Sequence, residues 1–458
     1  MKKIVSIFKN KEIVGRIFFT VMILFVLRIG AAITVPGVKV LSQLSDAMNS
    51  GNAIAMMDLL GGGALSNFSV FALGVSPYIT SQIIVELLSK DVLPALTELS
   101  KQGQYGRKKK EMATRYLTLL LGAVQGYGII MTMQNQTYIE LTLSTSGAGS
   151  FWTYAYIVTV LLAGSMLTMW LGDQITEKGL GNGISVIIFA GCVRSLPIQI
   201  STAWNKWVNA NIGHSSNDII RGSFQFALYV LALVAVVALV VFFELSRRKI
   251  PVQHAGKGGQ TAAMAKASFL PIKVNSAGVI PIIFASSIMM APTVIASFIS
   301  SDAANAPWLQ IFNYSSMYEM TWVDGESTWK MPWGLLIYLA LVILFTFFYA
   351  QMQIDPENLA DQFQKNGSYI PGIRPGKETE RYVSKVLNRV TFIGAFALAA
   401  IACLPIALTL SGIFGNDASL AIGGTGLIIV VGVCIEINSQ IDGLLAGKSF
   451  DEVQGGMA

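Results

Sequence analysis

The sequence predicts an all-α integral membrane protein with ten transmembrane helices. Hydrophobic residues make up 53% of the chain, charged residues only 13%, and the mean hydropathy is +0.58. A soluble domain carries about 25% charged residues. The apolar residues form runs of roughly 20, which is the helix length that crosses a hydrocarbon core of about 30 Å. Many of the 43 glycines lie inside these runs, which is typical of closely packed membrane helices.

Ten apolar runs define the expected helices. The first run is too long for the apolar part of a cleaved signal peptide and has no small-residue cleavage site, so we expect it to stay as a helix. In chain order the runs are Ile17–Val35, Phe68–Leu88, Met112–Met133, Trp152–Leu171, Ile184–Ile200, Ser223–Leu245, Ser276–Ile299, Trp333–Gln351, Thr391–Leu410 and Leu420–Ile437.

The lysines and arginines indicate the orientation of these helices. They concentrate in the N-terminal segment and in the loops after the second, sixth and eighth runs. Loops rich in Lys and Arg stay in the cytoplasm, so we expect both termini to be cytoplasmic. This basic face would attract anionic lipid, acidic partners or RNA phosphate.

The ten runs divide into five plus five around residues 201–222. Two such halves have opposite orientations, as inverted-topology repeats do. We expect a cytoplasmic N-terminus at 1–16, an N-terminal half at 17–205, a C-terminal half at 206–445 and a cytoplasmic tail at 446–458. The C-terminal half includes two long cytoplasmic loops, at about 246–275 and 355–390.

Motifs for catalysis or cofactor binding are missing. The nearest match to a phosphate-binding loop, Gly443–Ser449, has one residue too few between its glycines. Three cysteines without ligand spacing and two histidines give no metal site. Only Arg28 lies near the middle of a run, so the buried acidic relay of an ion-coupled transporter is not visible. We expect neither an enzyme, nor a cofactor, nor a metal.

The segment before the second run is unusual. Asp58–Ser66 is apolar and glycine-rich, yet too short to span, and it leads into Phe71–Gln82, which carries a proline and polar residues. Non-helical backbone at membrane depth is tolerated only where it is buried in protein or lines a cavity. This pattern predicts a re-entrant element inside a pore, and the alternative is an amphipathic turn on the surface.

A second feature lies in the loop after the eighth run. Two prolines and two glycines in Tyr369–Lys377 predict a rigid turn that presents Arg374. The alternative is that Arg374 pairs with Glu378 or Glu380.

Four stretches of sequence carry a family resemblance. They are Gly62–Ser66 continuing through Pro77–Ser81, Trp170–Gly183, Leu270–Pro281 and Pro371–Gly376. In these stretches, and in order from about Ile17 to about Asp442, the chain resembles the SecY family. The resemblance implies a protein-conducting channel of the bacterial cytoplasmic membrane. It would move unfolded secretory proteins across the membrane and release membrane-protein segments sideways into the lipid.

The resemblance also implies roles for particular residues. A short outer plug helix at about 54–66 would seal a ring of aliphatic side chains, and a lateral gate would lie between spans two and seven. The ring would consist of Ile79, Ile83, Ile184, Ile188, Ile283 and Ile429. The plug would include Leu59, Gly61, Gly62, Gly63, Ala64 and Leu65. Hinge or kink positions at the gate would be Gly74, Pro77, Gly278 and Pro281.

The implied partners are SecE- and SecG-like small membrane subunits, a SecA-type translocation ATPase, the ribosome, signal sequences and the lipid bilayer. Arg247, Arg248, Lys249 and Arg374 would dock the ribosome or the ATPase. The alternatives to a channel are a secondary solute transporter with inverted repeats and an intramembrane enzyme. The tail at 446–458 lacks the basic residues of many family members, and the outer loop at 300–332 has no assigned role.

Overall fold

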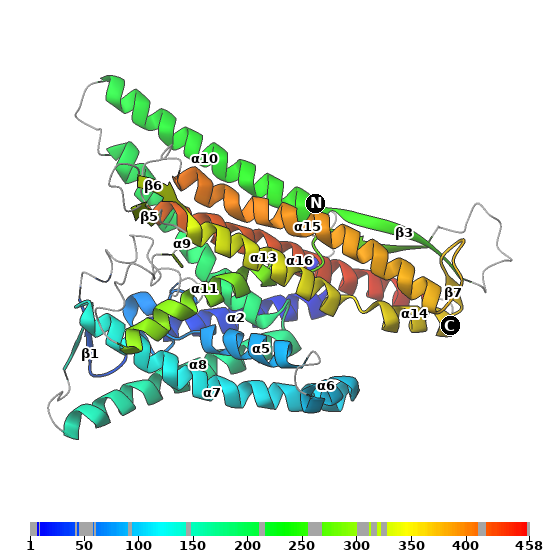
Figure 1. The fold of residues 1–458 in the computed structure, drawn as a ribbon, viewed down its shortest axis with the longest axis horizontal. Helices are drawn as coiled ribbons and strands as arrows, with labels where there is room; N and C mark the ends of the chain where they lie inside the picture. Colours follow the sequence, from blue (N-terminus) through cyan, green and yellow to red (C-terminus); the bar gives the residue numbers. More distant parts are fainter. Residues whose placement is uncertain are drawn as a thin grey trace.

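The computed structural model describes residues 7–8, 10–41, 44, 58, 61–89, 94–142, 148–209, 216–254, 268–299, 311–312, 318–321, 328–410 and 418–455. The described chain forms two groups of long helices, drawn blue to teal and green to red, that pack against each other (Figure 1). Helix α9 of the first group contacts α16 of the second. This arrangement agrees with an all-helical protein built from two halves.

The first group contains the helices of the N-terminal part of the chain. Asn10 caps α2, and Asn182 caps α9, by accepting a hydrogen bond from a backbone N–H two residues on. The helices are α2 (Lys11–Gly30), α5 (Ser76–Leu88), α6 (Pro94–Lys101), α7 (Gly103–Asn135), α8 (Ala148–Lys178) and α9 (Gly183–Trp207). Strands β1 (Val38–Val40) and β2 (Ile139–Leu141) form an antiparallel pair, and η1 (Leu65–Asn67) is a single 3₁₀ turn.

The second group contains α10 (Ser216–Leu245), α11 (Ile280–Ile299), α13 (Trp333–Gln353), α14 (Pro356–Lys365), α15 (Lys377–Leu410) and α16 (Ala418–Gly455). Strand β3 (Arg247–His254) lies between β4 (Ser268–Lys273) and β7 (Ser368–Tyr369), with both pairings antiparallel. Strands β5 (Tyr318–Thr321) and β6 (Thr328–Met331) form a separate hairpin. In Figure 1, β3, β7, α6 and α14 lie at one end of the bundle, and β1, β5 and β6 at the other.

Eight helical segments among the described residues are long and apolar enough to cross a membrane. They correspond to α2, α7, α8, α9, α10, α13, α15 and α16. Predicted spans two and seven correspond to α5, which has 13 residues, and to α11, whose described apolar stretch is Ile280–Met289. A helix of 13 residues is only about 20 Å long. In the N-terminal half, the buried non-helical segment around Phe68 and Val75 precedes α5.

The four gate residues lie at the starts of helices rather than at kinks within them. Gly74 and Gly278 both have positive φ, at 53° and 66°. Pro77 and Pro281 follow in the first turn of α5 and of α11. A proline there loses no helical hydrogen bond and its φ is already helical. The expected starts at Phe68 and Ser276 were therefore wrong, because these glycines break the chain direction first.

Other expected boundaries also move. Arg28 lies in the last turn of α2, not near mid-span, because that helix ends at Gly30. Helix α15 begins at Lys377, inside the expected second loop, where Glu378 and Glu380 suit a helix N-terminus. Helix α16 extends through most of the expected tail.

Candidate functional site

The six predicted ring isoleucines belong to one large apolar cluster of the structure. Five are buried, and Ile184 is partly buried and packs against this cluster. They come from four helices, α5, α9, α11 and α16. Ile79 and Ile83, like Ile184 and Ile188, are four residues apart and so share a helix face. Such a cluster offers water no hydrogen-bonding group, but whether the six form a ring stays a prediction.

The described part of the predicted plug contains helical backbone at Asp58 and a compact turn after it. Residues 61–64 form a turn that leads into η1. The Asp58 carboxylate accepts a hydrogen bond from the backbone N–H of Ser66 at 2.9 Å, and the Asp58 carbonyl accepts one from Gly63 at 2.7 Å. Leu59 lies outside the described residues. Residues 54–57, 59 and 60 of the expected plug helix lie outside the described residues, so the plug helix stays a prediction.

Burial controls the charge of that aspartate. It raises the pKa of the Asp58 carboxyl, while the backbone hydrogen bonds from Ser66 and Leu65 and the positive charges of Arg194 and Arg28 act in the opposite direction.

The turn packs closely on the start of α5. Gly74 faces Gly61 so closely that a Cβ on Gly74 would collide with the Gly61 backbone. The Ser69 hydroxyl donates to the Ala64 carbonyl at 2.9 Å. On the other side, Ser165 of α8 donates to the Gly74 carbonyl at 3.1 Å. Small residues on both sides let the two backbones meet, which seats the turn beside the isoleucine cluster.

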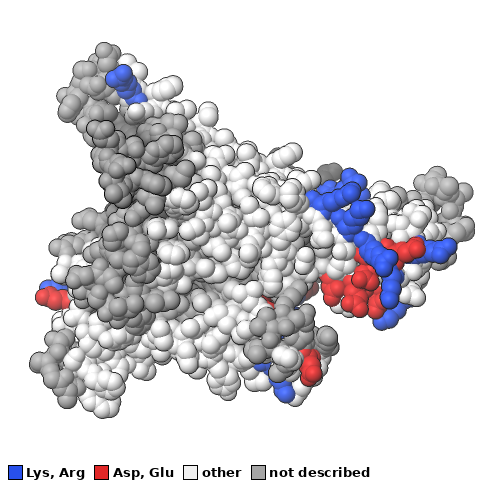
Figure 2. Space-filling model, in the orientation of Figure 1, with Lys and Arg blue, Asp and Glu red and all other residues white. Residues whose placement is uncertain are grey.

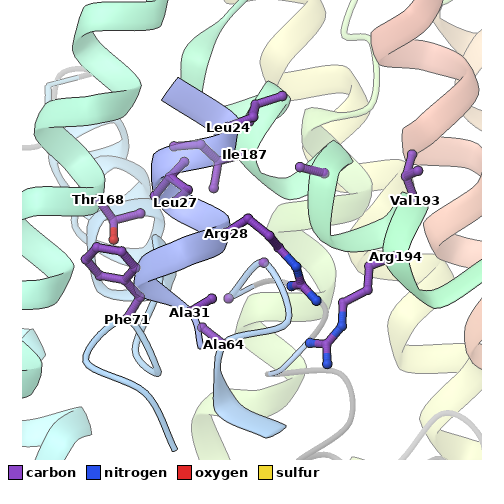
Figure 3. Close-up of a pocket in the computed structure, with 13 residues that line it drawn as sticks. Leu24, Leu27, Arg28, Ala31, Ala64, Phe71, Thr168, Ile187, Val193 and Arg194 are labelled. Atoms are coloured by element: carbon purple, nitrogen blue, oxygen red, sulfur yellow. The ribbon is translucent and has the colours of Figure 1, made fainter. Parts of the chain in front are cut away.

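Two arginines approach the turn from different helices. Arg28 of α2 and Arg194 of α9 line a cavity of about 220 Å³ together with Gly61, Gly62 and Ala64 (Figure 3). The guanidinium of Arg194 donates hydrogen bonds to the Gly63 carbonyl and, at 3.1 Å, to the Ser66 hydroxyl. The sequence analysis named only Arg28 as a charge inside a run and missed Arg194, although this arginine lies within the predicted run Ile184–Ile200. An arginine inside an apolar run was the available signal.

A polar contact joins the two halves near the opposite end of α5. Glu86 accepts hydrogen bonds from Gln82 at 3.0 Å and from the hydroxyl of Tyr349 on α13 at 2.6 Å. The ring of Phe284 on α11 packs edge-on against Tyr349, with centroids 5.2 Å apart. Sequence reasoning had no means of finding this contact, because Glu86 and Tyr349 lie 263 positions apart in the chain.

The four predicted docking residues are exposed. Arg247, Arg248 and Lys249 lie on β3, and Arg374 lies in the turn after β7. Within the described part of the chain, Arg374 forms no ion pair with Glu378 or Glu380. On the face drawn in Figure 2, charged side chains gather at this end of the molecule, and few of them lie over the middle of the bundle. Among the described residues, no group of three or more His, Cys, Asp or Glu side chains could hold a metal ion.

Comparison with known proteins gives consistent matches over the whole chain. A family model described as SecY matches residues 69–438. The chain is 41% identical over 443 residues to "Protein translocase subunit SecY 1" of Lactobacillus kefiranofaciens subsp. kefiranofaciens, with 97% of each chain covered. It is 40% identical over 454 residues to "Protein translocase subunit SecY" of Bacillus subtilis (strain 168), with 98% of each covered.

Solved structures share the fold at lower sequence identity. "The structure of a protein conducting channel" superposes with a TM-score of 0.65 and 15% identity, over 93% of this chain and 91% of that one. A second structure is described by "The plug domain of the SecY protein stablizes the closed state of the translocation channel and maintains a membrane seal". It superposes with a TM-score of 0.64 and 16% identity, over 93% of this chain and 91% of that one. "Sec61 in the Canine ribosome-channel complex from the endoplasmic reticulum" superposes with a TM-score of 0.62 and 15% identity, again over 93% of this chain and 91% of that one.

Proposed function

Because the chain belongs to the SecY family, we infer that it is the channel subunit of a protein translocase and not itself an enzyme. It conducts unfolded secretory proteins across the membrane and releases membrane-protein segments sideways into lipid. The observation that carries this function is the isoleucine cluster built from α5, α9, α11 and α16, with the Asp58-closed turn seated beside it. The relatives are translocase subunits and the matched structures are channels, so these comparisons give no support to the solute-transporter alternative.

The isoleucine cluster would act as the constriction of the channel. A narrow apolar ring excludes water and therefore ions. The same ring has no hydrogen-bonding groups that would select a sequence, so an unfolded chain of any composition can pass. A stretch of about 20 apolar residues gains free energy by leaving sideways into the lipid instead.

The turn at Gly61–Asn67 would belong to the plug. The solved SecY neighbour is described as having a plug domain that stabilises the closed state and maintains a membrane seal. Here the turn contacts α9 and the start of α5, two of the helices that supply the ring. Withdrawal of this segment would expose the constriction to the outer side.

The lateral gate would open between α5 and α11. These helices contact each other. Each is preceded by a glycine of positive φ and has a proline in its first turn. The two glycines, Gly74 and Gly278, are the proposed hinges, because they join each helix to non-helical backbone. Opening would separate the N-terminal half from the C-terminal half along this contact.

The charged end of the bundle would be cytoplasmic and would receive the partners. Exposed Arg247, Arg248, Lys249 and Arg374 suit the phosphates of ribosomal RNA or the acidic surface of a SecA-type ATPase. One solved neighbour is described as a ribosome–channel complex. SecE- and SecG-like subunits would pack on the exposed apolar sides, where large hydrophobic side chains such as Phe242 face outward.

Site-specific crosslinking tests the channel. A photoreactive group replaces Ile83, and a secretory precursor is stalled midway by a folded C-terminal domain, with the ATPase and partner subunits supplied. Ile393 on α15, which is 65% exposed, provides the matched isoleucine control. We expect crosslinks to the stalled chain from position 83 and not from position 393, lost when the signal sequence is deleted. Translocation without a crosslink at 83 would mean that the ring is misplaced.

A further inference from the structure

Arg194 is a cation inside a spanning helix whose partners lie in the predicted plug. It is near the middle of α9, and its guanidinium bonds to the Gly63 carbonyl and the Ser66 hydroxyl. Charged side chains within spanning helices are rare and almost always face the bundle interior or a water-filled cavity. Figure 3 shows the Arg194 side chain extending from α9 toward the plug turn. A cation held in this position requires a structural reason.

The turn is shaped to receive this side chain. Asp58 closes it through Gly63 and Ser66, so the two acceptors are held in place. Gly63 has φ +78°, and a Cβ at this position would collide with the Arg194 side chain. Hydrogen bonds from a guanidinium are charge-assisted and stronger than neutral ones. The turn therefore provides two acceptors for one arginine, the Gly63 carbonyl and the Ser66 hydroxyl, and the missing Cβ of Gly63 leaves space for the side chain.

Arg28 provides a comparison within the same cavity. It reaches the cavity from the last turn of α2, and its side chain is exposed there. Among the described residues it makes no hydrogen bond to the turn. Both arginines line the cavity, but only Arg194 bonds to the turn among the described residues. This contact therefore depends on the position of Arg194 on α9 and not on the presence of a positive charge in the cavity.

We propose that Arg194 is a positioning residue that latches the plug in the closed channel. Opening then requires the guanidinium to exchange the Gly63 carbonyl and the Ser66 hydroxyl for water. The proposal rests on the proposed function, since this turn is a plug only in a channel. Because hydrogen bonds to charged groups contribute more than neutral ones, loss of the latch should raise the open population about tenfold or more.

Reconstituted vesicles containing the chain and its partner subunits provide the test. Four versions are compared: the parent, Arg194→Gln, Arg28→Gln and a deletion of residues 54–66, which shows that the assay detects a missing plug. Ion leak is measured at rest. ATP-driven translocation is measured for a precursor with an intact signal sequence and for one with a defective signal sequence.

We expect Arg194→Gln to raise the resting leak and to admit the defective precursor, while Arg28→Gln behaves like the parent. A leaking deletion beside a tight Arg194→Gln channel would overturn the latch and leave the channel intact. Equal leak from the two arginine variants would also overturn it, since loss of cavity charge would then be the cause. A parent that translocates nothing with its partners supplied would overturn the proposed function itself.

Ser66→Ala keeps the test valid if Arg194→Gln does not fold. This variant removes one acceptor from the turn and leaves the arginine in place. We expect a leak between those of the parent and the plug deletion, and no added leak when it is combined with Arg194→Gln. A Ser66→Ala channel as tight as the parent would contradict the latch.

Discussion

Tyr349 on α13 donates a 2.6 Å hydrogen bond to Glu86 on α5, joining residues 263 positions apart in the chain. Both α5 and α13 contact α11. Phe284 of α11 packs edge-on against the ring of Tyr349. Glu86 is also held by Gln82 at 3.0 Å. This bond closes the contact between the two halves at one end of the proposed lateral gate.

Removing the tyrosine hydroxyl should loosen the gate. In Tyr349→Phe, Glu86 keeps only its bond from Gln82. The lost bond is part-buried, and a hydrogen bond to a charged group contributes about 1.5–3 kcal/mol. We expect translocation of a precursor with a weakened signal sequence to rise about tenfold relative to an intact one. Tyr116→Phe makes the same change at an exposed position of α7 and serves as the control. An unchanged ratio in folded Tyr349→Phe protein would show that the bond does not hold the gate.

The coupling between the two residues can be measured directly. Residues that share one hydrogen bond show interaction energies of about 0.5–3 kcal/mol in a double-mutant cycle. We expect Glu86→Leu, which removes the acceptor, combined with Tyr349→Phe to destabilise the protein in detergent by less than the sum of the single variants. Strictly additive changes in thermal unfolding would indicate that the contact is absent in the folded protein.

A polar side chain in the isoleucine cluster should make the channel leak. Ile283→Asn places an amide among buried isoleucines, where it offers water hydrogen bonds and breaks the apolar barrier. We expect higher resting ion conductance in planar bilayers and weaker selection of signal sequences. Ile393→Asn, at an exposed position of α15, should change neither property. Equal conductance in both variants would place the barrier elsewhere.

The two helix-start glycines should respond differently to alanine. Both have positive φ, which costs an alanine about 1–2 kcal/mol. At Gly74 the new Cβ would also collide with the Gly61 backbone, whereas at Gly278 nothing lies within 4 Å. We expect Gly278→Ala to lower thermal stability modestly and Gly74→Ala to lower it further and to increase the resting leak. Similar losses in both variants would argue against tight seating of the turn.

Charge reversal at the exposed turn after β7 should impair docking. Arg374→Glu replaces an attractive charge with a repulsive one, which weakens association with an acidic or phosphate-rich partner. We expect ATP-driven translocation to fall about tenfold or more while thermal stability stays unchanged. Arg221→Glu, exposed at the far end of α10, is the matched control. Normal translocation by Arg374→Glu would remove this residue from the docking surface.

Local features of the chain predicted much of the fold. Runs of about 20 apolar residues identified the eight described helices that are long and apolar enough to cross a membrane, while ten spans stay a prediction. The family resemblance and the channel function were confirmed by the comparisons. The boundaries were less accurate. Gly74 and Gly278 were expected near kinks inside helices, but their positive φ places them just before α5 and α11. The roles of the six ring isoleucines and of the plug stay predictions.

The sequence alone determined that the chain crosses the membrane repeatedly, because run length and the lack of charge depend only on neighbouring residues. Tertiary packing decided which distant groups meet. Arg194 lies 131 positions from Gly63, and Tyr349 lies 263 from Glu86. These pairs depend on how each helix is rotated and where it crosses its neighbours. That arrangement results from all the packing contacts together, so no single stretch of sequence contains it.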